Sequence, residues 1–254
     1  MNIIYLILFF LFGLLMGSIY TMIGLRLPDD DSKLFSASHC DVCYHKLSLL
    51  ENIPIISYIF LKGRCSYCHK RIDIKNILME FITGILFVLS YYVFGISIDL
   101  FIALGVVSVL VIVSVSDLVY MIIPDEVLIF FSGYFIIMQY FKAGLIGALE
   151  HVFIGLFLFF IMYTIMIVGE KLFQRESLGG GDVKMMFLFG LVLDPLVGSL
   201  TIFLGSILAL PMSLFIYYRY KTREIPFGPF LLLAFAILYF MGIDSNYIIN
   251  LLSI

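Results

Sequence analysis

Long apolar runs alternate with short polar links along most of the chain, which is the pattern of a protein whose helices span a membrane. A spanning helix needs about 20 apolar residues, because each residue advances an α-helix by about 1.5 Å and the hydrocarbon core is about 30 Å thick. The pattern therefore predicts about eight spans. They cover residues 3–25, 77–98, 100–123, 127–141, 145–169, 183–193, 196–218 and 227–250. The spacing of Gly13 and Gly17 in the first span is typical of closely packed helices.

The positions of Lys and Arg predict the orientation, because basic residues accumulate in cytoplasmic loops. With the N-terminus outside, the inward-facing segments are 26–75, the link after residue 117, 170–184 and 219–226. These segments hold 14 of the 15 basic residues, and only Lys142 lies elsewhere. The run 183–193 is too short to cross, so we expect it to begin inside the membrane or near its inner surface.

The composition excludes a soluble domain and agrees with this topology. Apolar residues make up 63% of the chain and charged residues 13%, against about 45–50% and 25% in soluble domains. The formal net charge of −3 is too small to suggest a nucleic-acid partner. We expect an all-α polytopic membrane protein with three parts: a first transmembrane helix (1–25), a cytoplasmic loop domain (26–75) and a region of about seven further spans (76–254).

All four cysteines lie in the 26–75 loop, as two CxxC pairs separated by 21 residues: Cys40, Cys43, Cys65 and Cys68. Two such pairs can present four thiolates to one tetrahedral ion, usually Zn²⁺. A metal would also stabilise a loop of about 50 residues with few large apolar runs. Two disulfides are the alternative, but a cytoplasmic loop is kept reduced. The CxxCH pattern ending at His69 also fits covalent haem attachment, which would leave Cys40 and Cys43 unexplained.

Two aspartates are predicted at membrane depth, where an ionised side chain is costly and needs a functional or structural explanation. Asp117 follows the 16 uncharged residues 101–116, and Asp182 follows three glycines at the start of the short run 183–193. The topology places both at the inner ends of their spans, where they could form a catalytic pair like that of aspartic proteases. Ion or proton transport and pairing with Lys184 are alternatives. The glycines permit close approach of another backbone, such as a substrate strand.

Several motifs in this order resemble those of the type IV prepilin leader peptidases, which are membrane aspartic proteases of the GxGD kind. The resemblance covers nearly the whole chain. It is carried by Gly17-Ser18 through Pro28, by Glu51–Tyr58 and Lys62–Cys65 between the CxxC pairs, by Asp117 with Ile123-Pro124-Asp125, and by Gly179–Asp182 with Lys184 and Met185.

The resemblance implies an aspartic endopeptidase in the bacterial inner membrane. Its substrates would be prepilins or pseudopilins, cut after a short basic leader at the cytoplasmic membrane face. Asp117 and Asp182 carry over as the catalytic pair, and Cys40, Cys43, Cys65 and Cys68 carry over as zinc ligands. The new N-terminus would then be N-methylated from S-adenosylmethionine. Pili, type II secretion and DNA uptake are all systems that such an enzyme could serve.

One departure concerns methylation. The family usually has Arg-Tyr-Pro before its second span, where this chain has Lys75-Asn76-Ile77, although Glu80 matches the acid that follows. A leader peptidase without methyltransferase activity is therefore an alternative, and an ion-coupled transporter is a further one. Glu80 is either a partner of the helix dipole or a functional acid.

Overall fold

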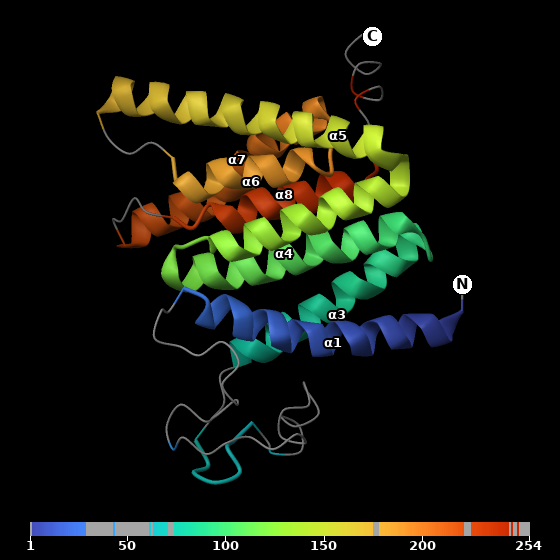
Figure 1. The fold of residues 1–254 in the computed structure, drawn as a ribbon. Coiled ribbons are helices and arrows are strands. Elements are labelled where there is room, and N and C mark those ends of the chain that lie inside the picture. The colour runs from blue at the N-terminus through green and yellow to red at the C-terminus, as the bar shows by residue number, and fades with distance from the viewer. Residues whose placement is uncertain are drawn as a thin grey trace. The chain divides into compact units, whose positions relative to one another are not determined.

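The computed structural model describes residues 2–28, 43, 61, 63–70, 74–174, 178–220, 225–243, 245 and 248. The described part of the chain divides into two compact units, Met1–Gly95 and Ile96–Ile254. Its regular elements are all helices, as Figure 1 shows. An all-helical membrane fold is thus confirmed. Most of the predicted domain 26–75 lies outside the described residues, so the three-part division of the sequence stays a prediction.

The first unit is built on two helices, α1 (Ile3–Arg26) and α3 (Ile74–Phe94), which pack closely. A Cβ at Gly13 would lie 2.8 Å from the Cα of Gly84, and a Cβ at Gly17 would lie 2.8 Å from the Cα of Glu80. The close packing predicted from the glycine spacing is therefore confirmed. Because later residues of α1 face earlier residues of α3, the helices are antiparallel, and the two ends of the cysteine-containing segment start close together.

The second unit contains α4 (Ile98–Tyr120), α5 (Asp125–Phe173), α6 (Gly180–Gly190), α7 (Pro195–Tyr220) and α8 (Gly228–Phe240). Helix α4 is buried along most of its length between α5 and α8. Helix α6 packs mainly against α5, and α7 packs against α8. The unit therefore has an interior helix, α4, whose end can carry buried polar groups.

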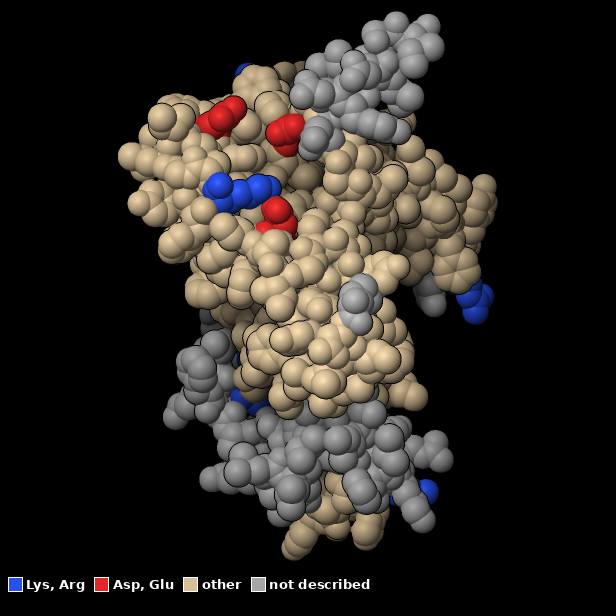
Figure 2. All heavy atoms as spheres, turned by 90° about the vertical axis from the view of Figure 1, so that its right-hand side faces the viewer, with Lys and Arg blue, Asp and Glu red and all other residues tan. Residues whose placement is uncertain are grey.

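Helix α5 contains both predicted runs 127–141 and 145–169, joined through a kink at Gly144. Gly144 has φ 72° and ψ −171°, a conformation that side chains disfavour, and the ribbon reverses direction there in Figure 1. At this end of the unit Lys142 Nζ lies 2.6 Å from Asp99 Oδ1. The lone basic residue outside the predicted inner segments is thus paired with an acid. Figure 2, which faces this side, shows few charged side chains among the described residues.

Five described helices are long and apolar enough to cross a membrane, namely α1, α3, α4, α5 and α7. This establishes a multi-pass membrane protein. Helix α6 has 11 residues, which agrees with the expectation that the sixth run is short, although it begins and ends three residues earlier than predicted. Helix α8 ends at Phe240, not near residue 250, because Gly242 takes a positive φ of 61° two residues later.

The contact between α1 and α3 predicts that Gly13→Ala destabilises the protein. The new methyl group would meet the backbone of Gly84, which can retreat only if the helices separate, and overpacking of this kind costs about 1–3 kcal/mol. A lower unfolding temperature in detergent is expected. The matched control is Gly133→Ala on α5, where a Cβ would meet nothing within 4 Å. Equal unfolding temperatures for both variants would contradict the packing.

Candidate active site

Two buried aspartates converge at one end of the second unit. Asp117 lies in the last turn of α4 and is 5% exposed, and Asp182 lies in the first turn of α6 and is 7% exposed. The two side chains are close enough to interact electrostatically. Acids far apart in the chain therefore approach each other near the end of α4 and the start of α6, while Lys142 and Asp99 mark the opposite end of the same unit.

The segment after Asp117 folds back over the site. Helix α4 ends because Met121 adopts a left-handed conformation, with φ 55°, and donates its N–H to the carbonyl of Asp117. The hydroxyl of Ser116 donates to the carbonyl of Ile122 at 2.6 Å, which holds the turn against the helix end. Helix α5 then begins after Pro124, which fixes the direction of the chain.

Ile123 fills the space between the starts of α6 and α8. A Cβ at Gly181 would lie 2.9 Å from the Cβ of Ile123, and a Cβ at Gly228 would lie 3.4 Å from its Cδ1. Glycine at position 181 thus permits a close contact, as the sequence predicted. The contacting group is the side chain of Ile123 in the same unit and not a substrate backbone. Gly179 and Gly180 are exposed, and a Cβ at Gly180 would meet nothing within 4 Å. Open space therefore remains beside the backbone that leads to Asp182.

The two aspartates have different hydrogen-bonding environments. Oδ2 of Asp117 accepts a bond of 3.0 Å from the backbone N–H of Gly228 at the start of α8. Oδ1 of Asp182 is buried and has no hydrogen-bond partner among the described residues. A buried carboxyl oxygen without a partner is costly, so this atom is suited to bind a water molecule, a proton or a substrate group.

Lys184 does not pair with either buried aspartate. Its Nζ lies 2.7 Å from both carboxylate oxygens of Asp125, in the first turn of α5. Asp125 therefore has a structural contact, and the contact ties the start of α5 to α6. Pairing with Lys184, one of the explanations left open for the intramembrane acids, does not account for Asp117 and Asp182 in this structure.

Three of the four predicted zinc ligands lie together. The sulfur atoms of Cys43, Cys65 and Cys68 are all within 4.8 Å of one another, and those of Cys43 and Cys65 are 3.8 Å apart. Thiolates bound to one tetrahedral zinc at about 2.3 Å would be separated by about 3.8 Å, whereas a disulfide requires about 2.05 Å. The spacing therefore fits a shared tetrahedral metal ion and not a disulfide between Cys43 and Cys65. Cys40 lies outside the described residues.

The turn between Cys65 and Cys68 is closed by backbone hydrogen bonds. The N–H of His69 donates to the carbonyl of Cys65 at 3.0 Å, and the N–H of Cys65 donates to the carbonyl of Lys70 at 2.9 Å. His69 has a positive φ of 58°. A tight turn of this kind keeps both thiols of the CxxC pair on one side, as a shared metal ion requires.

The fold and these two sites define an integral membrane protein that carries a buried pair of acids in one unit and a cysteine cluster in the other. Comparison with known proteins identifies its family. A model described as "Bacterial Peptidase A24 N-terminal domain" matches residues 11–94, and one described as "Type IV leader peptidase family" matches residues 104–214. The chain belongs to the type IV leader peptidase family, which confirms the resemblance found in the sequence.

Similar proteins include three that carry the name "Prepilin leader peptidase/N-methyltransferase". The one from Bacillus subtilis (strain 168) is 36% identical over 72% of this chain and 72% of its own length. The one from Myxococcus xanthus is 34% identical over 71% of this chain and 54% of its own length. The one from Vibrio cholerae serotype O1 is 28% identical over 94% of this chain and 98% of its own length. No solved structure matches the chain.

Sequence reasoning missed Gly228. The available signal was its position between Pro226 and Pro229 at the start of the last predicted span, because a glycine flanked by prolines marks a constrained turn. Nothing in the sequence indicated that this turn would meet Asp117, since 111 residues separate the two.

The ion pair between Lys184 and Asp125 predicts a stability effect that depends on charge. Both side chains are about half exposed, 50% and 56%, so solvent screening limits the expected loss in Lys184→Met or Asp125→Asn to about 0.5–1 kcal/mol. The charge-swapped double variant, Asp125→Lys with Lys184→Asp, should recover part of this loss. Unfolding temperatures in detergent measure both effects. Additive losses in the swapped variant would show that the pair does not join α5 to α6.

Proposed function

We propose that this protein cleaves the leader peptide from prepilin-like precursors, with Asp117 and Asp182 as its catalytic pair. The observation that carries the proposal is the convergence of two buried carboxyl groups from α4 and α6, one of which has an oxygen that no described residue hydrogen-bonds. The family assignment and the names of the similar proteins support leader peptidase activity over ion-coupled transport.

The proposed chemistry needs one ionised and one protonated carboxyl group, which is the low-energy state of two close carboxyls. The carboxylate takes a proton from a water molecule whose oxygen attacks the carbonyl carbon of the scissile peptide bond. The carboxylic acid gives its proton to the leaving nitrogen as the C–N bond breaks. The products are a free carboxyl terminus on the leader and a free amino terminus on the pilin.

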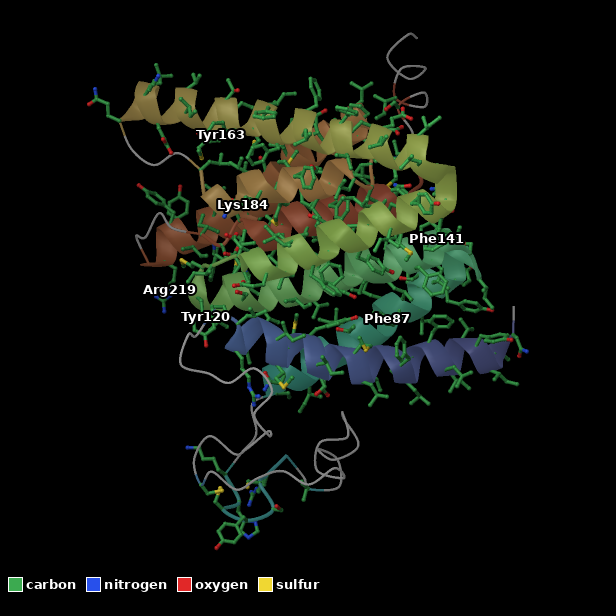
Figure 3. The ribbon with its side chains drawn as sticks, in the orientation of Figure 1. Phe87, Tyr120, Phe141, Tyr163, Lys184 and Arg219 are labelled. Carbon is green, nitrogen blue, oxygen red and sulfur yellow. The ribbon has the colours of Figure 1, made fainter. Side chains whose placement is uncertain are left out.

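The position of the pair suits a substrate with a basic leader before an apolar helix. Lys184 and Arg219 lie at the end of the second unit that carries Tyr120, and Phe141 lies at the other end, as Figure 3 shows. We propose that this end faces the cytoplasm, with the N-terminus outside, about eight spans and the cysteine domain cytoplasmic. A leader held inside by its charge would then present its last peptide bond near Gly179 and Gly180, where the backbone is exposed.

We further propose that the protein N-methylates the new N-terminus from S-adenosylmethionine, as the names of the similar proteins suggest. In the proposed cytoplasmic domain, Cys40, Cys43, Cys65 and Cys68 would hold one Zn²⁺, which would stabilise the fold of the loop. The enzyme would act in the bacterial inner membrane on prepilins or pseudopilins.

The catalytic assignment predicts that Asp182→Asn and Asp117→Asn each lower cleavage by at least about 1,000-fold, because an amide cannot take or give the proton. Mass spectrometry of a prepilin incubated with purified enzyme measures the cut and also detects the methyl group. The control is Asp99→Asn at the opposite end of α4, which should cleave normally. Normal cleavage by either active-site variant, in folded protein, would refute the assignment.

The zinc assignment predicts that Cys65→Ser reduces bound zinc well below one ion per chain, because a hydroxyl is a much weaker zinc ligand than a thiolate. Elemental analysis of purified protein measures the metal. The control is Tyr67→Ser, which changes an exposed side chain of the same turn and leaves the thiols in place. An unchanged zinc content in Cys65→Ser would rule out this residue as a ligand.

A further inference from the structure

Gly228 contacts a catalytic carboxyl group through its backbone alone. It is the first residue of α8, it is buried, and its N–H donates to Oδ2 of Asp117 at 3.0 Å. The next residue, Pro229, has no N–H, and Phe227 at the cap makes no side-chain capping bond. The donor that points at Asp117 is therefore the Gly228 N–H, at the positive end of the helix dipole of α8.

The same position has no room for a side chain. A Cβ at Gly228 would lie 2.9 Å from Oδ2 of Asp117 and 3.4 Å from Cδ1 of Ile123. The short contact is to the carboxyl group itself, so a methyl group here would either break the hydrogen bond or turn the Asp117 side chain. Ile123 is itself packed against Gly181, which limits how far the surroundings can move.

We propose that Gly228 is a positioning residue that fixes the orientation of the Asp117 carboxyl group for catalysis. An amide N–H only donates, so Oδ2 accepts. Because the unprotonated oxygen of a carboxylic acid is the stronger acceptor, this bond favours Oδ1 as the position of a proton on Asp117. Oδ1 is accordingly the oxygen that exchanges protons with the attacking water, and Oδ2 serves as the anchor. This inference rests on the proposed catalytic role of Asp117.

The kinetic test is Gly228→Ala in the full-length enzyme with a prepilin substrate. A misplaced catalytic group commonly costs about 100-fold, so we expect kcat to fall by about that factor while KM changes less than about threefold. The control is Gly205→Ala on α7, where the new Cβ would lie 2.9 Å from Cδ2 and 3.2 Å from Cα of Leu231 on α8. This control perturbs α8 without touching Asp117, and its kcat should stay near that of the unmodified enzyme.

A second test separates positioning from general disruption of the fold, through unfolding temperatures in detergent. Gly228→Ala should lower the unfolding temperature in the unmodified enzyme. It should have a much smaller effect in Asp117→Ala, where the carboxyl group that it would meet is gone. If Gly228→Ala alone fails to fold, the double variant should fold. Unfolding temperatures do not depend on enzyme activity. The measurement therefore tests the contact between Gly228 and the Asp117 carboxyl group whatever the role of Asp117 in catalysis.

Three results would overturn the proposal. The first is a kcat for Gly228→Ala within about threefold of the unmodified enzyme. The second is an equal loss of kcat in Gly205→Ala. The third is an equal fall in unfolding temperature with and without the Asp117 carboxyl group, or a double variant that still fails to fold. Normal cleavage by Asp117→Asn would instead refute the proposed catalytic pair, and the unfolding test would still report on the contact.

Discussion

Two interacting carboxyl groups that are both buried destabilise a protein unless hydrogen bonds or shared protons compensate, and the second unit is arranged around this constraint. The ends of α4, α6 and α8 meet where Asp117 and Asp182 lie. Within the described part of the chain, one donor compensates Asp117, through the Gly228 N–H, whereas Asp182 Oδ1 has no hydrogen-bond partner. The destabilisation is therefore only partly relieved by the protein, which is the condition expected of a site that completes its interactions with substrate and water.

Contacts that do not involve the two acids hold this arrangement in place. Ile123 packs against the start of α6, and the Lys184–Asp125 ion pair joins α6 to the start of α5. Ile123 lies in the four-residue connection 121–124 between α4 and α5, and Asp125 directly follows it. The position of Asp182 relative to Asp117 therefore depends on this short connection. A rigid connection of this kind can keep two catalytic groups aligned although they come from different helices.

Much of this could be predicted from the sequence because the signals are local. Apolar runs predicted the helices, and the 11-residue length of the run 183–193 predicted that α6 would be short. The cost of an ionised side chain at membrane depth was enough to identify Asp117 and Asp182 as candidate functional residues, because it does not depend on their contacts. The Gly228 bond and the Lys184–Asp125 pair connect residues 111 and 59 positions apart, so no periodicity reveals them. The end of α8 was placed too late because apolar residues continue beyond Gly242, and hydropathy does not register a change in backbone conformation.

The division of the chain into units bears on how two activities could coexist. The family models meet between residues 94 and 104, and the compact units meet between Gly95 and Ile96. Every described contact of the aspartate site lies in the second unit, and the cysteine cluster lies in the first. The antiparallel packing of α1 and α3 brings together the ends of the segment that carries the cysteines. Ends that are already close lower the entropic cost of folding this segment around a metal ion. Each site thus has its described structural support within its own unit.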